Sequence, residues 1–559
     1  MNLHFLEAIE ACESLDELAS LAGDFGDDAQ LMHEVDARRA TLVDEADKTV
    51  KRIATTAKAL ALAIPTAPAR RLPNSRTELG NVERLLKAVG DNLMYAEDLQ
   101  AWFEWNGVYW TRTSDGRLTE LCGDTVKRIP DEASRILDDD DRIAFLKFAA
   151  GSQKKNMIAN MAYLAAADSR VRVQTRDLDS NPHLLGVLNG AVDLRTGSLL
   201  APDRSARITV VAAAPYDPTA SCPLFEQTLL DSQGGDVAMA SFIQRLLGHS
   251  LLGNPTEEII VIPYGNGSNG KSTIFGAIRN VLGGFARAAD AESFMADAKG
   301  GANAGRPRED ILRLRGARFV YVSEPDENSE LKESFVKAMT GGDAMPARGV
   351  NAKVTIEVMP TWVPFMPTNH RPIIKGDDFA IWRRIVCIPF LMKFNKEFGN
   401  KAKGGADIHR KDKLKAESAG ILAWLVRGAI AYQAEGLNAP AKVGDAKESY
   451  KRDMDLLGDW LEDCCELDSG YKVAIEALWF SWSAFAERRN ELGYIKSQKK
   501  LSTKLSNRNN GADFVKVENL VYRGKRARGF SGLRLRKADA AIALEAILES
   551  ATRAEVREA

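Results

Sequence analysis

Apolar and polar positions along this chain of 559 residues change their spacing from one region to the next. In the first 75 residues, Leu15, Leu18 and Leu21 recur at roughly helical spacing among polar side chains, which predicts amphipathic helices. The proline-rich stretch 64–73 is typical of a linker. We therefore expect a helical N-terminal region over residues 1–75.

The next region, residues 76–235, mixes helical spacing with turn-rich strands. Trp102–Trp110 places aromatic residues on both sides of an Asn-Gly turn, the strongest short-range signal of a β-hairpin. Asn189–Gly197 reads as a second pair of strands around a turn. We expect a mixed α+β domain here.

Short, almost uniformly apolar runs mark residues 236–395. Such runs are typical of parallel strands that are buried on both faces. They alternate with helical patterns, so we expect an α/β domain with a parallel sheet. Charged helices over 396–445 would connect it to the rest of the chain.

The C-terminal region, residues 446–540, predicts a winged helix, and 541–559 a helical tail. Ile475–Phe485 is an aromatic-rich amphipathic helix whose aromatic stripe we interpret as core. Ser497–Arg508 is a polar, basic helix with an N-capping serine, in the recognition-helix position. Two predicted strands, near Phe514 and over Gly529–Leu535, flank a basic tip.

Composition sets limits on the class of protein. The chain is long enough for three or four domains, and its net charge is -2. Its six cysteines form no C-x-x-C pair, so we expect neither a zinc site nor a disulfide framework. The first residues do not read as a secretion signal, and we find no membrane span. We expect a cytoplasmic protein.

A glycine-rich octamer carries the clearest chemistry. Gly265–Ser272 fits G-x-x-x-x-G-K-[ST], in which backbone N–H groups surround phosphates. An apolar strand precedes it and a helix follows, so the helix N-terminus faces the anion. We expect Lys271 to contact the β- and γ-phosphates of ATP and Ser272 to ligate Mg²⁺. The predicted ATP-binding residues are Gly265, Asn266, Gly267, Ser268, Asn269, Gly270, Lys271, Ser272 and Thr273.

Hydrolysis needs further polar groups, and they follow two later apolar runs. Glu324 ends the run that begins at Arg318, and we expect it to polarise the attacking water and, with Asp326, to bind the metal. Asn369 ends a second run, where it would sense the γ-phosphate. An acidic turn and an ordinary Asn turn remain the alternatives for these two segments.

Arg383 and Arg384 stand directly before a further apolar run. Arginine is well suited to bidentate phosphate contacts. Taken alone, an arginine pair is usually a solvated or ion-paired face.

The order of these motifs resembles that of the superfamily 3 helicases. More specifically, it is similar to the phage/plasmid primase–helicase family, which includes the poxvirus primase–helicase. The resemblance covers roughly residues 90–540. The segments that carry it are Gly265–Thr273, Arg318–Glu324, Ala338–Asp343, Pro367–His370 and Trp382–Ile385, with Asn189–Gly197, Tyr216–Pro223 and Leu246–Leu251 upstream.

The resemblance implies a ring-forming AAA+-type motor, usually hexameric, that translocates on single-stranded DNA in the 3′ to 5′ direction. It places Arg384 as an arginine finger acting on a neighbouring subunit's ATP, with Arg383 as the second candidate. The segment with Arg348 and Lys353 resembles the DNA-contacting pore hairpin. A separate primase or replication initiator is a possible partner in this setting. The stretch before the matched region is too short for a primase module, so we expect no priming activity.

Charge concentrates near the C-terminus. From Arg488 to Lys537 the chain carries fifteen Lys and Arg against three Asp and Glu, which is typical of a nucleic-acid surface. A solvated basic face is the alternative. The candidate DNA-binding residues here are Lys499, Lys500, Lys504, Arg523, Lys525, Arg526 and Arg528.

Three functions remain to be distinguished. The first is an ATP-dependent replicative DNA helicase of a phage or mobile element, acting on single-stranded or forked DNA. The second is a P-loop kinase of a small molecule or nucleotide, which would explain the glycine loop but not the basic C-terminus. The third is an origin-binding or packaging scaffold controlled by ATP.

Overall fold

The computed structural model describes residues 33–44, 48, 76–296, 308–349, 355–375, 379–394, 409–489, 494–509, 513–522 and 524–558. Residues 33–44 are helical, as expected for that stretch. The remainder of the predicted region 1–75, with its linker, lies outside the described residues apart from residue 48.

Contacts divide the chain into two compact units, and this division runs through the predicted domain of residues 76–235. Residues 1–88 and 121–164 form one unit. Residues 89–120 and 165–559 form the other.

The first unit is helical where it is described. Asn81 on α4 (Glu78–Val89) donates to Ser152 Oγ at the end of α6 (Asp139–Ser152), 3.0 Å away. Arg84 forms two hydrogen bonds of 2.7 and 2.8 Å with Glu132. Two further helices, α5 (Asp115–Lys127) and α7 (Lys155–Ala166), contribute to this part of the chain.

Both predicted strand pairs of the second unit are confirmed. In the first, Asn106 accepts hydrogen bonds from the backbone N–H groups of Val108 and Tyr109, which closes the turn of the hairpin. The sheet has the order β3-β2-β1-β4. Its strands are β1 (Leu93–Ala96), β2 (Ala101–Trp105), β3 (Trp110–Arg112) and β4 (Arg172–Val173). The second sheet is β5 (Leu184–Val187), β6 (Gly190–Asp193) and β7 (Ser198–Leu200).

Two acidic stretches in these regions, residues 138–141 and 177–179, accept hydrogen bonds from backbone N–H groups. Asp138 accepts from Asp141 N (2.7 Å) and so caps α6. Asp179 accepts from the backbone N–H groups of Thr209 and Val210. Within the described ranges, no cluster of three or more His, Cys, Asp or Glu residues could hold a metal ion. Both acidic stretches are therefore turns or caps.

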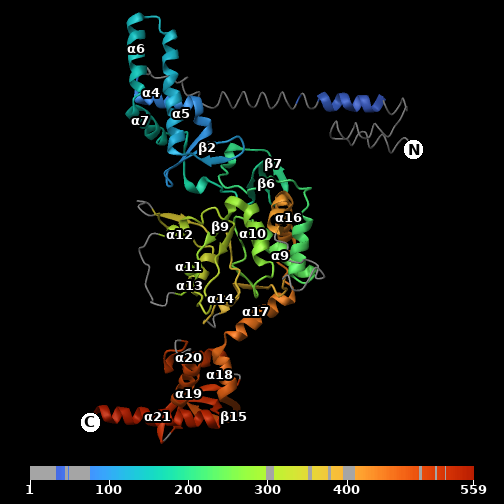
Figure 1. Ribbon diagram of the computed structural model, residues 1–559, viewed down its shortest axis with the longest axis vertical. Helices are drawn as coiled ribbons and strands as arrows, with labels where there is room; N and C mark the ends of the chain where they lie inside the picture. Colours follow the sequence, from blue (N-terminus) through green and yellow to red (C-terminus); the bar gives the residue numbers. More distant parts are fainter. Residues whose placement is uncertain are drawn as a thin grey trace. The chain divides into compact units, whose positions relative to one another are not determined.

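A five-stranded parallel sheet organises the middle of the chain, as the apolar runs predict (Figure 1). Its strand order is β14-β8-β13-β10-β9, so β8 and β13 lie inside the sheet. The strands are β8 (Ile260–Tyr264), β9 (Ala286–Ala289), β10 (Phe319–Val322), β13 (Val363–Phe365) and β14 (Ile385–Pro389).

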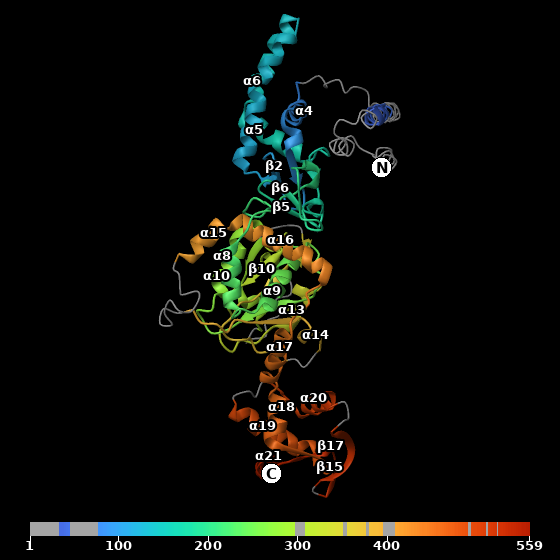
Figure 2. The same cartoon turned by 90° about the vertical axis from the view of Figure 1, so that its right-hand side faces the viewer.

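Both faces of this sheet are covered, which explains the uniformly apolar strands. Val261 packs into one hydrophobic cluster, whereas Ile260 and Ile262 pack into another, as the two-residue period of a strand requires. Helices α9 (Val237–His249), α10 (Lys271–Leu282) and α16 (Ser418–Glu435) contribute to the first cluster (Figure 2). Helices α11 (Ala291–Phe294), α13 (Glu333–Thr340) and α17 (Ala441–Asp453) contribute to the second.

Shorter elements complete this part of the chain. They are α8 (Pro223–Ser232), α12 (Glu309–Leu312), α14 (Phe379–Trp382), α15 (Arg410–Ala416), and the antiparallel pair β11 (Met345–Ala347) and β12 (Ile356–Val358).

Arg318, at the entrance to β10, is a fully buried cation. Its guanidinium donates to the carbonyl oxygens of Pro182, Leu184 and Leu251 and lies over the ring of Phe285. Burial lowers its pKa to about 10. One side chain thus satisfies backbone acceptors from two other segments.

We expect Arg318→Met to lower the free energy of unfolding by roughly 3–5 kcal/mol, because three carbonyl groups each lose a charged donor in the interior of the chain. The measurement is the midpoint of urea unfolding. Arg313→Met, at an arginine that is 74% exposed, is the matched control and should change the stability little. Equal midpoints for both variants would refute the structural role of Arg318.

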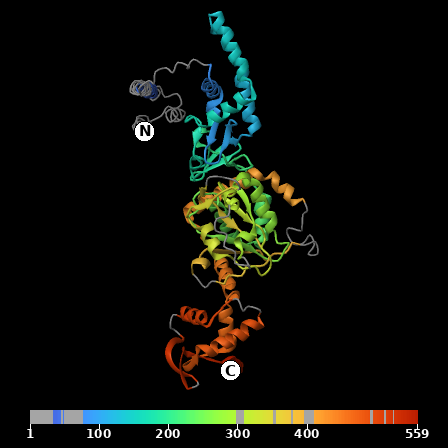
Figure 3. The ribbon, with the colours of Figure 1, turned by 90° about the vertical axis from the view of Figure 1, so that its left-hand side faces the viewer.

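The C-terminal segment contains its predicted helices and strands in order, preceded by a helix and a strand that were not predicted. Helix α18 (Leu456–Cys464) precedes β15 (Cys465–Ala474) and α19 (Ile475–Arg488), followed by α20 (Gln498–Asn509), β16 (Val515–Tyr522), β17 (Lys525–Leu535) and α21 (Lys537–Glu558). The strands pair in the order β15-β17-β16, and Figure 3 shows β16 and β17 in red beside the orange helices.

Two details refine the prediction for this segment. Trp482 and Phe485 are buried in its core, which confirms the interpretation of the aromatic stripe. Strands β16 and β17 extend into the predicted tip, and Tyr522 pairs with Lys525. The described part of the chain contains no helix that is both long and apolar enough to cross a membrane.

Candidate functional site

The glycine loop joins β8 to α10, as its position between a strand and a helix predicts. Gly265 has φ +150, and a Cβ at this position would lie 2.1 Å from the carbonyl oxygen of Phe390. Gly270 has φ +89 and caps α10. Side chains are disfavoured at both positions. The loop therefore leads into the N-terminus of a helix, the end of a helix that attracts anions.

Contacts within the chain hold this loop in shape. Asn269 Nδ2 donates to the carbonyl oxygens of Asn266 and Phe390, each 3.1 Å away. The backbone N–H of Phe394 donates to Ser268 O at 2.7 Å. Asn266, Gly267 and Ser268 are exposed. These hydrogen bonds hold the loop in place, while its three exposed residues remain accessible to solvent.

Lys271 is a buried cation at the start of α10. Its amine donates to the carbonyl oxygen of Gly265 and, at 3.2 Å, to Asn369 Oδ1. Burial lowers its pKa, an effect opposed by the charge of Glu324. Both hydrogen-bond partners are neutral oxygens, so the amine retains its attraction for an anion.

Glu324 and Asn369 come together at the carboxyl ends of neighbouring strands. The backbone N–H of Asn369 donates to Glu324 Oε1 at 2.7 Å. Thr368 forms a bridge with Tyr264, which brings the end of the β13 segment beside the loop. The structure therefore unites Lys271, Glu324 and Asn369 in one hydrogen-bonded group.

The predicted metal ligands are placed differently from one another. Ser272, on the first turn of α10, is exposed, and Glu324 has a second carboxylate oxygen beside the one that binds Asn369. Asp326 lies in the exposed turn after Glu324. Mg²⁺ is commonly held by one or two protein oxygens together with substrate phosphates. The glycine loop, the buried amine, the serine hydroxyl and the carboxylate fit a magnesium–triphosphate complex.

The two candidates for the arginine finger, Arg383 and Arg384, lie between α14 and β14 and have different environments. The side chain of Arg384 is 10% exposed and donates to Glu258, Thr340 Oγ1 and the carbonyl oxygen of Ala380. The side chain of Arg383 is 51% exposed and makes an ion pair of 2.7 Å with Glu258. Arg384 is thus enclosed by contacts within this chain, whereas the side chain of Arg383 is half exposed.

Arg371 is a functional candidate that the sequence analysis missed. Its guanidinium lies between the rings of Tyr264 and Tyr450, 4.9 and 4.8 Å from their centroids. It also forms an ion pair of 2.5 Å with Asp453. Arg371 follows Asn369 by two residues, and Tyr264 directly precedes Gly265. Its position after the Thr-Asn-His motif was the one available signal.

The predicted DNA-contacting residues are dispersed. Arg348 is exposed directly after β11, at the end of the β11–β12 pair where the two strands are connected. Lys353 lies outside the described residues.

In the C-terminal segment, Lys499 and Lys500 are exposed on α20, whereas Lys504 is half-buried with its amine 4.8 Å from the ring of Tyr494. Lys525, Arg526 and Arg528 are exposed on β17, and Arg528 makes an ion pair of 2.8 Å with Glu518. Arg523 lies outside the described residues.

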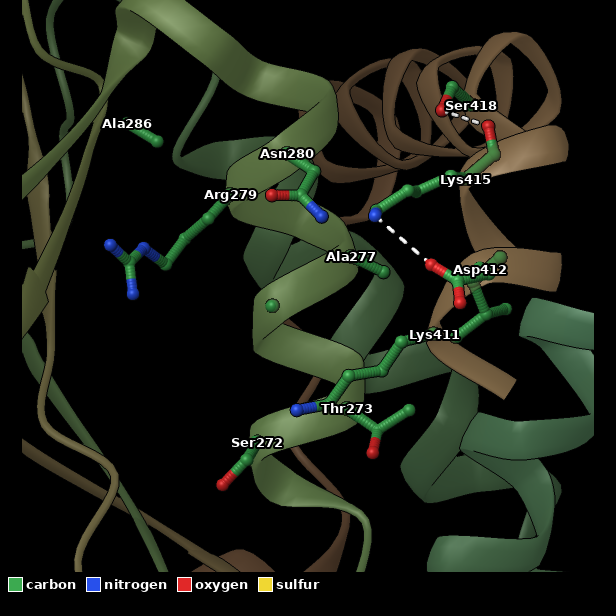
Figure 4. A pocket seen from close by; sticks show the side chains of 12 residues that line it. Ser272, Thr273, Ala277, Arg279, Asn280, Ala286, Lys411, Asp412, Lys415 and Ser418 are labelled. Carbon is green, nitrogen blue, oxygen red and sulfur yellow. Dashed lines mark hydrogen bonds and ion pairs between the residues drawn. The ribbon is translucent and has the colours of Figure 1, made fainter. Parts of the chain in front are cut away.

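A cavity of about 590 Å³ opens beside the glycine loop. Ser272, Thr273 and Gly276 on α10 form one wall, and Lys411 and Lys415 on α15 form the other. Figure 4 shows the Lys411 amine directed toward the first turn of α10.

Comparisons with known proteins place these features in context. A family model described as "D5 N terminal like" matches residues 82–234. The chain is 27% identical over 312 residues to "Putative helicase L207/L206" of Acanthamoeba polyphaga mimivirus, which covers 52% of this chain and 31% of the relative. It is 26% identical over 257 residues to "Putative primase C962R" of African swine fever virus, strain Badajoz 1971 Vero-adapted, with 44% and 26% covered.

A third relative matches over a longer stretch. "Putative helicase 184R" of Invertebrate iridescent virus 6 is 24% identical over 415 residues, with 66% of this chain and 40% of the relative covered. The apo structure of the NrS-1 C-terminal region (305–718) is similar with a TM-score of 0.46 and 10% identity, and the match covers 81% of this chain and 99% of that one. The chain spans less than a third of the mimivirus relative.

Proposed function

Given that this chain belongs to the phage and viral primase–helicase-like family, we propose that it is an ATP-driven DNA helicase. In this proposal it is a superfamily 3 motor that forms a ring, usually of six subunits. It translocates 3′ to 5′ on single-stranded DNA during replication of a phage or mobile element.

The observation that supports the proposal most is the meeting of three residues from distant segments. Lys271, Glu324 and Asn369 each follow a different strand of the parallel sheet, yet they form one hydrogen-bonded group. A lysine, a carboxylate and an amide at the carboxyl ends of parallel strands are the groups that phosphoryl transfer to water requires.

Each residue then has a distinct role at the triphosphate. The loop N–H groups and Lys271 bind the β- and γ-phosphates, the Ser272 hydroxyl faces the metal, and Glu324 orients the attacking water. When bound, Mg²⁺ neutralises charge on the transferred phosphoryl group. Asn369 holds Glu324 through its backbone and Lys271 through its side chain, so it links the two groups that act on either side of the γ-phosphate.

The ring completes this site with an arginine from the next subunit. Arg383 is the better candidate for that role, because its side chain is exposed, whereas Arg384 is enclosed by contacts within its own subunit. Arg348, which is exposed directly after β11, would contact DNA phosphates, a sequence-independent contact that a translocating motor needs.

The C-terminal segment would add a second DNA contact as a winged helix. Its order of helices and strands, with α20 in the recognition position and the β16–β17 hairpin as the wing, matches that arrangement. The basic residues Lys499 and Lys500 lie exposed at the start of α20.

We expect the double variant Lys499→Ala, Lys500→Ala to bind duplex DNA more weakly and with a shallower dependence on salt. Each lost phosphate contact should reduce the slope of log K against log salt by about 0.9. Fluorescence anisotropy across a salt series measures this. Lys147→Ala, at an exposed lysine on α6, is the control. An unchanged slope would remove α20 from the DNA interface.

Strand displacement on forked DNA tests the proposed function. The chain should unwind forks with a 3′ tail, in the presence of Mg-ATP, and its native mass should be that of a ring. A monomer whose ATP hydrolysis ignores DNA would indicate a kinase instead. Tight binding to one DNA sequence without strand separation would indicate a scaffold.

A further inference from the structure

The cavity beside the glycine loop continues the surface that the loop begins. Ser272 and Thr273, the last residues of the predicted phosphate site, are also the first residues of the cavity wall. Its volume of about 590 Å³ lies within the roughly 300–1,000 Å³ typical of small-molecule sites. A ligand held by its phosphates at the loop can therefore extend into this space.

The lining is polar and carries an excess of positive charge. The lining includes three cations, Arg279, Lys411 and Lys415, and one carboxylate, Asp412, which forms an ion pair of 3.1 Å with Lys415. Arg279 is held over the ring of Tyr321, 4.5 Å from its centroid. Asn280 adds an amide that can both donate and accept hydrogen bonds. Such a set suits a polar ligand with an anionic end.

Gly276 keeps the middle of the cavity open. It lies inside α10, where glycine is less favourable than alanine. A Cβ added at this position would meet no other atom within 4 Å, because it would project into open space. The loss of helix stability that glycine causes is offset if a ligand binds in the space beside Gly276.

We propose that this cavity receives the sugar and base of the nucleoside triphosphate whose phosphates bind Gly265–Ser272, and that Lys411 contacts the phosphates from α15. This inference rests on the proposed nucleotide site and deepens it. Lys411 lies far from the glycine loop in the sequence, yet its amine is directed toward the first turn of α10 (Figure 4).

Titration calorimetry on the full chain with Mg-ATP and with magnesium tripolyphosphate tests the proposal, because the second ligand has no sugar or base. We expect wild type to bind Mg-ATP more tightly. Gly276→Leu, whose side chain would project into the cavity, should weaken Mg-ATP binding by about tenfold and leave tripolyphosphate binding unchanged. Lys411→Gln should weaken both ligands.

Gly444→Leu is the matched control, since Gly444 is a helical glycine on α17 whose added Cβ also meets nothing within 4 Å. It should bind both ligands as wild type does. Equal loss of both ligands in Gly276→Leu, or no loss of either, would overturn the proposal, and so would equal wild-type affinities for the two ligands. A wild-type chain that binds neither ligand would instead overturn the proposed function.

Discussion

Replacing Lys271 with alanine is expected to reduce ATP hydrolysis by about 10²–10³-fold, the usual effect of losing one group that stabilises charge in the transition state. The amine is buried and positioned by two neutral oxygens, so a phosphate would replace them as its partner. The same amine binds Asn369, so its loss also frees the residue that holds Glu324.

Steady-state phosphate release, with and without single-stranded DNA, measures this effect. Lys87→Ala, at an exposed lysine on α4, is the control and should hydrolyse ATP as wild type does. A Lys271→Ala chain that still hydrolysed ATP and unwound forks at the wild-type rate would exclude the proposed site.

Mixing Arg383→Ala subunits into wild-type rings is expected to depress ATP hydrolysis more than in proportion to the dose. An arginine supplied in trans contributes about 10³–10⁵-fold to phosphoryl transfer, so each variant subunit would inactivate its neighbour's site. Arg383 is 51% exposed and can be supplied in this way.

Arg384→Ala should behave differently, because its side chain is 10% exposed and binds Glu258, Thr340 and Ala380 of the same subunit. We expect a lower thermal midpoint of the isolated variant and a loss of activity in proportion to the dose. Proportional loss with Arg383→Ala and excess loss with Arg384→Ala would return the finger to Arg384, the position that the family resemblance favours.

The meeting of Glu324 and Asn369 beside the glycine loop could be predicted from the sequence, because each of them follows an apolar run. The carboxyl ends of parallel strands lie along one edge of a sheet. Glu324 and Asn369 therefore lie near the glycine loop when the strands before them are close to β8. The helices and strands of the C-terminal segment were predictable for a related reason. Their apolar and basic residues recur with the period of each element.

Contacts between distant side chains could not be predicted. The burial of Arg384 depends on Glu258, 126 residues earlier, and the position of Arg371 depends on Tyr450 in α17. Neither pairing leaves a periodic trace in the sequence. The division of the predicted domain 76–235 between two units could not be predicted either. Residues 121–164 pack with residues 76–88, although residues 89–120 separate them in the chain.

The place of Arg371 between two tyrosines has a mechanical consequence. Tyr264 ends the strand that carries the loop, and Tyr450 is anchored in α17 by a hydrogen bond from its hydroxyl to the carbonyl oxygen of Pro372. Asp453, which binds the same guanidinium, is separated from α18 by only two residues. A displacement of the loop on nucleotide turnover would therefore reach α17 through the contacts of Arg371 with Tyr264, Tyr450 and Asp453. In the proposed motor, such a displacement would move α17 and with it the chain that follows.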